Sequence, residues 1–345
     1  MTTLVLQAAG SAIGSFFGGP VGAVIGRAAG ALAGSAIDGA LLASGGRAVE
    51  GPRLKEMDGL AASEGEPIPR LYGRARLGGQ LIWATRFEEQ VNTTTRKASG
   101  GKGMSAPRTR ETSFTYFANL AVALCDGPIG FVRRVWANGQ EVDLTTVTMR
   151  VHRGDADQVP DGLIVAKEGA GMAPAYRGTA YVVFERLPLA DYGNRIPQFS
   201  FEVVKPLPGV AQAIRSVNLI PGSSEFAYEP ARVSQDLGLG ATRAENRHQR
   251  QAASDVIASL DQLQALCPNL SSVQIIVSWF GDDLRAGSCT VAPRIDNASK
   301  VTQGAQWNVA GLSRAGARMV SQIEGRPAYG GTPVSYTHLT LPTNR

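Results

Sequence analysis

Histidine and cysteine, which often bind metals or act as nucleophiles, are few in this chain and far apart in its sequence. The histidines are His152, His248 and His338, and the cysteines are Cys125, Cys267 and Cys289. No pair among them has the spacing of metal ligands. An odd number of scattered cysteines favours free thiols in a reducing compartment over a disulfide framework. We therefore expect three free thiols and no metal site.

Motifs that bind phosphates or nucleotides are incomplete. Gly238-Leu-Gly240 lacks the third glycine of a dinucleotide fingerprint, and no strand is predicted before it. Gly101-Lys102 is followed by glycine, where a phosphate loop has serine or threonine. The sequence thus assigns no catalytic, metal-binding or cofactor-binding residue, and we expect no cofactor.

Asp282 and Asp283 are the carboxylates with the most suggestive position, because they follow a mostly apolar run that predicts a buried strand. Glycoside hydrolysis needs two carboxyl groups that flank one bond, and these usually come from different strands. Two sequence neighbours do not meet that requirement. We favour the other interpretation, in which they pair with Arg285 or form a solvated turn.

The composition is that of a globular chain. Of its 345 residues 43% are hydrophobic, which is enough for two or three domains. The 34 basic residues exceed the 29 acidic ones only slightly, and the formal net charge is +5. This balance gives no support to sequence-specific nucleic-acid binding.

The first 45 residues have a glycine at every fourth position, separated by small and apolar residues. These glycines are Gly10, Gly14, Gly18, Gly22, Gly26, Gly30 and Gly34. On a helix they share one face, along which another backbone can approach closely. Pro20 should divide the segment into a glycine-zipper helical hairpin.

This hairpin could pack against partner subunits or enter a membrane transiently. In a membrane, Arg27 would lie within the span at a cost of about 2.5–3.5 kcal/mol. Because no positive residue precedes the apolar run, it does not resemble a secretory signal, and we expect synthesis in the bacterial cytoplasm.

Residues 46–207 favour a mainly antiparallel β domain, because short apolar runs alternate with Gly, Pro and Asn. Strands are predicted at residues 80–87, 113–124, 130–136, 147–152, 179–184 and 198–204, with a turn at residues 137–139. Residues 92–111 are polar and basic, which predicts a mobile hairpin tip. That tip could be solvated, or it could contact DNA or an acidic neighbour.

Residues 208–334 favour an α/β architecture. Apolar residues at helical spacing predict a helix over residues 246–266, and a buried strand is predicted over residues 272–280. This strand has no predicted barrel neighbour, so we expect it to pair irregularly with residues 306–310 or to leave an open edge. For the same reason, we expect residues 209–345 to show a weak or absent cooperative unfolding transition.

Five phrases together resemble the tail-tip and baseplate-hub proteins of siphophages. They are Glu66-Pro-Ile-Pro-Arg-Leu-Tyr-Gly73, Ala123-Leu-Cys-Asp-Gly-Pro-Ile-Gly130, Arg134-Val-Trp-Ala-Asn-Gly139, Pro174-Ala-Tyr-Arg-Gly-Thr-Ala-Tyr-Val-Val-Phe184 and Gly193-Asn-Arg-Ile-Pro197. With the glycine-rich start, they resemble in particular the large baseplate protein of alphaproteobacterial gene transfer agents, over residues 1–333. Residues 279–287 and 325–333 resemble the start of the TIM-barrel-like, glycoside-hydrolase-related domain of that protein. Residues 335–345 resemble a translated sequencing adapter, and we expect them to be non-native.

The resemblance implies an α+β protein with three parts: a glycine-zipper helical hairpin (residues 1–45), a β-rich tail-hub domain (46–207) and the incomplete start of a TIM-barrel-like domain (208–334). It implies a structural role in a phage-like particle, where the protein closes the tail tube as a trimer, binds other tail and baseplate proteins and contacts the recipient cell envelope. The alternatives are a cell-wall glycoside hydrolase whose barrel is mostly missing here and a glycine-zipper pore during DNA ejection. For the present sequence we expect no enzymatic activity.

Large polar and aromatic residues within the resembling phrases are candidate anchors for partner proteins, because Arg, Trp and Tyr are enriched at interface hot spots. They are Arg70, Trp136, Tyr176, Arg177 and Arg195. The competing interpretation is that they pack or pair within their own domain.

Overall fold

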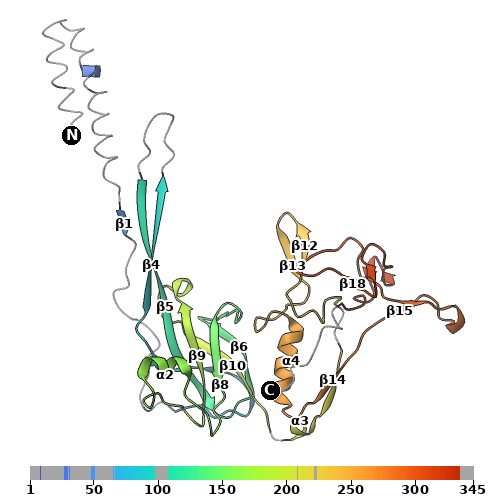
Figure 1. Ribbon diagram of the computed structural model, residues 1–345, viewed down its shortest axis with the longest axis horizontal. Coiled ribbons are helices and arrows are strands. Elements are labelled where there is room, and N and C mark those ends of the chain that lie inside the picture. Colours follow the sequence, from blue (N-terminus) through green and yellow to red (C-terminus); the bar gives the residue numbers. More distant parts are fainter. Residues whose placement is uncertain are drawn as a thin grey trace. The chain divides into compact units, whose positions relative to one another are not determined.

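The computed structural model of the chain describes residues 8, 27–29, 31, 48–50, 65, 67–97, 108–207, 209–220 and 224–334 (Figure 1). Their contacts define two compact units, one of residues 1–57, 87–117 and 188–194 and one of residues 58–86, 118–187 and 195–345. The seven glycines of the amino-terminal ladder and residues 335–345 lie outside the described residues. What the sequence predicts for them therefore stays a prediction.

The first unit contains a long two-stranded ribbon. Strand β4 (Glu88–Lys97) pairs antiparallel with the first half of β5 (Arg108–Asp126), from Glu88 opposite Phe117 to Lys97 opposite Arg108 (Figure 1). Strand β1 (Ala48–Glu50) pairs parallel with β5 at residues 110–112. The prediction of a loop over residues 92–111 is therefore wrong at both ends, and residues 98–107 lie outside the described part. The threonine run in β4 is β-branched, so it favours a strand even though it lacks an apolar pattern.

The second unit begins with two antiparallel sheets. One contains β3 (Gln80–Ala84), residues 118–126 of β5, β9 (Thr179–Pro188) and β8 (Thr148–His152). The other has the order β2 (Gly73–Gly78), β10 (Phe199–Lys205), β6 (Phe131–Ala137) and β7 (Gln140–Glu141). The rings of Phe184 and Phe199 stack across the two sheets at 4.7 Å between centroids. Both are fully or almost fully buried, which contributes about 1.5–3 kcal/mol each.

The predicted antiparallel β architecture of this region is confirmed, and so are its individual strands, with ends that shift by a few residues. The turn after Trp136 is confirmed as well: Asn138 and Gly139 have φ angles of 50° and 83°, as a tight hairpin between β6 and β7 requires. Helix α2 (Gly162–Glu168) and the 3₁₀ helix η1 (Ala190–Tyr192) were not predicted. Asp161 caps α2, because its side chain accepts a hydrogen bond from the Leu163 backbone.

Residues 209–334 contain a short βαβ unit. Strands β11 (Ser216–Leu219) and β14 (Ser272–Ile275) pair in parallel, and helix α4 (Asp255–Leu266) lies between them in the sequence. The remaining elements are α3 (Val210–Ala213), β12 (Ser234–Gly238), β13 (Ala241–Ala244), β15 (Phe280–Gly281), η2 (Ala286–Ser288), β16 (Val291–Ala292), β17 (Val301–Gln303), β18 (Asn308–Val309), β19 (Leu312–Ser313), β20 (Gln322–Ile323) and β21 (Arg326–Pro327). Strands β13, β12 and β17 form an antiparallel sheet.

Four predictions for this region are corrected by the structure. The helix begins at Asp255 rather than residue 246, because the Asn246 side chain instead binds the backbone of residues 229, 231 and 233. The predicted strand ends at Ile275, and it pairs with β11 rather than with residues 306–310. Strand β12 does precede Gly238-Leu-Gly240, which forms the β12–β13 turn with positive φ at all three residues.

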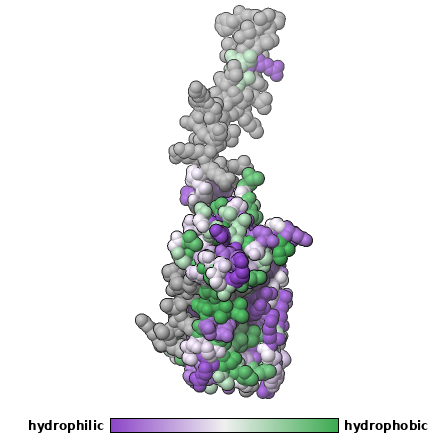
Figure 2. All heavy atoms as spheres, turned by 90° about the vertical axis from the view of Figure 1, so that its right-hand side faces the viewer, coloured by the Kyte–Doolittle hydropathy of each residue, from purple (hydrophilic) through white to green (hydrophobic). Residues whose placement is uncertain are grey.

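The region also has a hydrophobic core of its own. Phe226, Val233, Ile295, Trp307, Val309 and Val334 form one buried cluster. The expected weak or absent cooperative unfolding transition was based on a strand without barrel neighbours. Because β14 pairs with β11 and the region has this buried cluster, that reason does not hold. Apolar surface remains nonetheless: Trp279 and Ile323 are exposed, and Figure 2 shows green apolar areas on the face that it presents. No helix among the described residues is long and apolar enough to cross a membrane.

Candidate functional site

A cavity of about 770 Å³ lies at the carboxyl end of β11, where Leu219 and Ile220 form part of its wall. The Tyr228 hydroxyl, also at this cavity, lies 2.9 Å from the Leu219 carbonyl oxygen and 2.7 Å from that of Ile276. It therefore shares its one proton between the carbonyls that end β11 and follow β14. Burial raises the pKa of Tyr228 to about 12, so the hydroxyl stays protonated at neutral pH.

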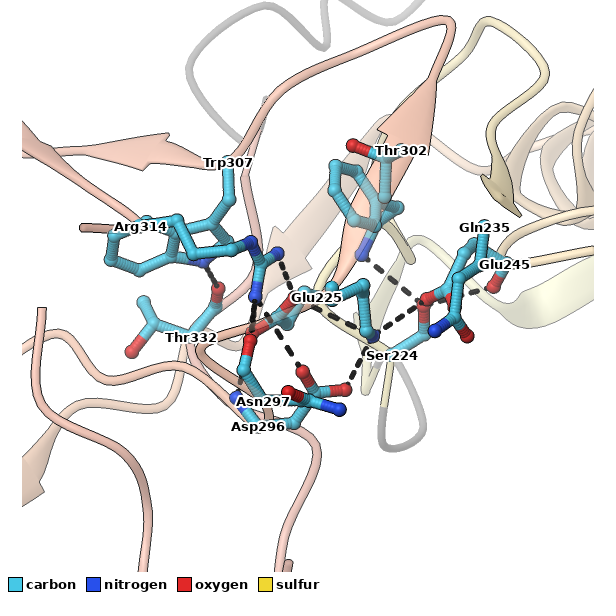
Figure 3. Close-up of polar contacts among 12 residues, drawn as sticks. Ser224, Glu225, Gln235, Glu245, Asp296, Asn297, Thr302, Trp307, Arg314 and Thr332 are labelled. Carbon is cyan, nitrogen blue, oxygen red and sulfur yellow. Dashed lines mark hydrogen bonds and ion pairs between the residues drawn. The ribbon is translucent and has the colours of Figure 1, made fainter. Parts of the chain in front are cut away.

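A network of charged side chains adjoins this cavity, and Figure 3 shows the polar contacts around Glu225, Glu245 and Asp296. Glu245, Asp296 and Lys300 belong to the network and also line the cavity wall. The Lys300 ammonium lies 2.5 Å from Asp296 Oδ2, 3.0 Å from Glu245 Oε2 and 3.6 Å from Glu225 Oε2. Arg314 Nη2 lies 2.5 Å from Glu225 Oε2, and the Asp296 backbone N–H donates to Glu225 Oε1 at 2.7 Å. The Glu225 side chain has no exposed surface.

The network has three carboxylates and two cations, so it holds one excess negative charge. Burial raises the pKa of Glu225, although the hydrogen bond from Arg314 opposes that effect. Burial disfavours the charge of Lys300, but its three carboxylate neighbours outweigh this and raise its pKa above the ordinary lysine value. Both pKa shifts favour the protonated forms of Glu225 and Lys300, which lowers the excess negative charge of the network.

This network links segments that are distant in the sequence, and its geometry does not suit catalysis. Its members come from positions before β12, after β13, before β17 and after β19, and each carboxylate has a cationic partner. A glycoside hydrolase needs one carboxyl free to donate a proton and one free to attack or to activate water. Carboxylates held by lysine and arginine at these distances are better suited to a scaffold.

A second ion cluster lies in the β domain around Asp161, whose side chain is 1% exposed. Arg150 Nε lies 2.7 Å from Asp161 Oδ2, and His152 Nε2 lies 2.9 Å from the same oxygen. Burial would raise the pKa of Asp161, but the hydrogen bonds from Arg150, His152 and the Leu163 backbone hold it well below its usual range. The cluster thus fixes the start of α2 against β8.

Asp161 predicts a specific loss of stability in acid. A depressed pKa in the folded state stabilises the fold above the unfolded value of about 3.9, and this stability is lost as the pH falls through the folded value. We expect Asp161→Asn to lower the free energy of unfolding at pH 7 by about 2–3 kcal/mol and to flatten the decline below pH 4. Urea titrations from pH 7 to pH 2 measure both effects. Asp157→Asn, a nearby exposed position, is the control, and an equal effect of the two substitutions would contradict the prediction.

The five candidate anchors lie in different environments. The Arg76 guanidinium lies over the Trp136 ring at 3.9 Å, and the exposed Arg70 side chain lies 3.8 Å from Asp126. Tyr176 packs edge-on against Tyr181, and Arg177 donates to the Gln158 carbonyl. Arg195 is exposed, and it forms no ion pair with any residue that the structure describes. Tyr176 and Arg177 are sequence neighbours, and among the described residues no ion pair, side-chain hydrogen bond or ring contact joins any two of the five.

The other residues that the sequence singled out for possible chemistry are two aspartates and three cysteines, and they do not form a common site. Asp283 and Arg285 form an exposed pair at 2.7 Å, and Asp282 accepts a hydrogen bond from the Thr290 backbone. The three cysteines are free thiols; burial, with the charge of Asp126 nearby, raises the pKa of Cys125 to about 11. Within the described ranges, no three His, Cys, Asp or Glu side chains form a group that could hold a metal ion.

Comparison with known proteins finds similarity to solved structures. No family model matches the chain, and no curated protein matches it. The chain is similar to a protein chain in the structure described as the virion of a native gene transfer agent (GTA) particle. The two are 46% identical, the match covers 59% of this chain and 39% of that chain, and the TM-score is 0.34. The match thus covers well under half of the length of that relative.

Sequence reasoning missed the members of the buried network. Glu225, Glu245, Asp296, Lys300 and Arg314 are spread over 90 residues and belong to no motif. The one local signal is the spacing of Asp296 and Lys300, four residues apart, but such pairs are common on surfaces and do not predict burial.

Proposed function

We propose that this chain is a structural component of a phage-like DNA-delivery particle of the gene-transfer-agent type. Its resembling phrases and the 46% identity to a virion protein support this class. Within the particle, we assign it to the tail tip or baseplate hub, where it closes the tail tube and contributes to contact with the recipient cell. It is made in the bacterial cytoplasm and then joins other tail proteins.

The observation that carries an assembly function is the β4–β5 ribbon. Along β4, residues 90–95 are exposed, and so are Arg110, Glu111 and Ser113 on the paired part of β5. Val91 has 53% of its surface exposed. Apart from residues 110–112 of β5, where β1 also pairs, the ribbon has two strands. Such a ribbon is at best marginally stable in water, and it gains stability by packing against further protein. Neighbouring copies of the chain would supply that protein, in a trimer according to the family resemblance.

The domain roles follow from the same proposal. Residues 46–207 form the hub, and residues 208–334 start a barrel-like domain whose first parallel strands are β11 and β14. Residues 1–45 form the glycine-zipper hairpin, which packs against partner subunits; transient insertion into the recipient membrane is its alternative role. Trp136, Arg70 and Arg195 remain candidate contacts with neighbouring proteins.

A cell-wall glycoside hydrolase is the second candidate, and one observation favours it. The cavity at the carboxyl end of β11 has the position that active sites occupy in barrel enzymes. The carboxylates at this cavity that belong to the buried network are paired with Lys300, which weakens the case for the present sequence. Release of soluble sugars from peptidoglycan by this protein would reverse our preference.

The assembly proposal is tested by the mass of the purified protein in solution. We expect a homo-oligomer whose dissociation constant rises at least about tenfold in Val91→Glu, because a charge placed in an interface must be desolvated. Val159→Glu is the matched control, since Val159 is 68% exposed and lies away from the ribbon. Analytical ultracentrifugation measures both variants. A wild-type protein that stays monomeric at high concentration, or equal effects of the two substitutions, would refute the ribbon interface.

A further inference from the structure

Arginines converge on a second cavity, of about 460 Å³, where the segment after β13 meets strands β6 and β7. Its walls include Arg134, Arg232, Arg247 and Arg250, together with Glu141 and Asp143. All of these residues belong to the second compact unit. The cavity is within the size range of small-molecule sites.

The cavity walls are joined by direct contacts. The Leu144 backbone N–H donates to the Arg250 carbonyl at 2.8 Å, and Arg250 Nη1 donates to the Glu141 carbonyl at 2.9 Å. Arg247 Nη2 lies 2.6 Å from Asp143 Oδ1. Burial would raise the pKa of Asp143, but hydrogen bonds from Arg247 and Thr145 lower it to about 2. The carboxylate therefore stays charged and holds Arg247 in place.

Several guanidinium donors at this cavity have no strong partner. Arg134 has its nearest carboxylates, Glu141 and Glu202, at 3.8 Å, which is beyond hydrogen-bond length. Arg232 makes neither an ion pair nor a side-chain hydrogen bond within the described part of the chain. Arg250 uses one of its five N–H groups on the Glu141 carbonyl. Unpaired donors in a concave site are available to a ligand.

The charge of the cavity indicates what that ligand is. Four arginines and two carboxylates leave two positive charges. A phosphate monoester carries about −1.5 to −2 at pH 7, and guanidinium groups bind its oxygens in pairs. Glu141 and Asp143 also line the cavity, and their carboxylate oxygens can accept hydrogen bonds from hydroxyl groups. The Gln249 side-chain amide is already bonded to the backbone of residues 251 and 252.

We propose that this cavity binds the phosphate monoester of a sugar-sized, polyhydroxylated molecule. Arg134, Arg232 and Arg250 hold the phosphate, and Arg247 fixes the wall through Asp143. The site is distinct from the ribbon interface and from the buried network around Lys300. Its existence therefore does not depend on the assembly function.

Isothermal titration calorimetry of the whole protein with glucose 6-phosphate tests the proposal. We expect saturable binding, weaker binding of inorganic phosphate and none of glucose. Arg232→Ala should weaken the binding of glucose 6-phosphate at least about tenfold, because it removes hydrogen bonds to a charged group. Arg326→Ala is the matched control, an exposed arginine of β21, and it should bind as the wild type does.

Arg134→Gln serves as a second variant, and an unchanged melting temperature shows that each variant is folded. The proposal is overturned if glucose 6-phosphate does not bind at millimolar concentration, or if Arg232→Ala and Arg134→Gln leave its binding unchanged. The same calorimetric titration is also carried out with a single-stranded DNA oligonucleotide. If it binds through Arg232 while glucose 6-phosphate does not, the arginines form a nucleic-acid surface and the sugar-phosphate site is wrong.

Discussion

Lys300→Met should lower the free energy of unfolding by about 3–5 kcal/mol, because it leaves three carboxylates, two of them buried, with a single cation, Arg314. The Lys300 side chain is 5% exposed, so water is a poor replacement for the lost ammonium. Chemical denaturation measures the change. Arg326→Met, at an exposed position of β21, is the control and should change stability little.

A double variant separates the charge effect from lost packing. If excess negative charge causes the loss, Glu245→Gln combined with Lys300→Met should recover part of it, since one carboxylate is neutralised. If the loss comes from the missing side-chain volume, the two substitutions should add. A Lys300→Met protein as stable as the wild type would mean that the network contributes nothing to the fold.

Trp307→Ala should destabilise residues 209–334 by about 3–5 kcal/mol, because it empties the centre of their core. Trp307 is 2% exposed, and its Nε1 donates to the Thr332 carbonyl at 2.9 Å. The substitution therefore removes a large apolar surface and also leaves a buried carbonyl without its donor. Trp307→Phe keeps most of the packing and should cost less.

Differential scanning calorimetry of the whole chain measures this effect. Trp279→Ala is the matched control, since Trp279 is 43% exposed and lies outside the buried cluster. We expect a lower or lost transition for Trp307→Ala and little change for Trp279→Ala. Similar melting of the two variants would show that the cluster around Trp307 is not a cooperative core.

The sequence alone determined the β architecture of residues 46–207, because alternating apolar residues and turn-forming residues act locally. Asn138-Gly139 illustrates this: its preference for positive φ produces the β6–β7 turn whatever surrounds it. The proposed class of protein also rests on sequence phrases. By contrast, the end of β4 was misjudged, because a polar threonine run carries no period that distinguishes a strand from a loop.

Only the tertiary structure decided which distant residues meet. Strand β14 pairs with β11, which lies more than 50 residues earlier in the sequence. Glu225 and Lys300 are also far apart in the sequence, so no local pattern predicts their contact. The arginine-lined cavity depends on how the segment after β13 lies against β6 and β7. Local sequence patterns fix φ, ψ and the buried face of each element, whereas pairing between elements depends on the free energy of the whole packed chain. The charge network and the proposed phosphate site are therefore properties of the fold and of no single segment.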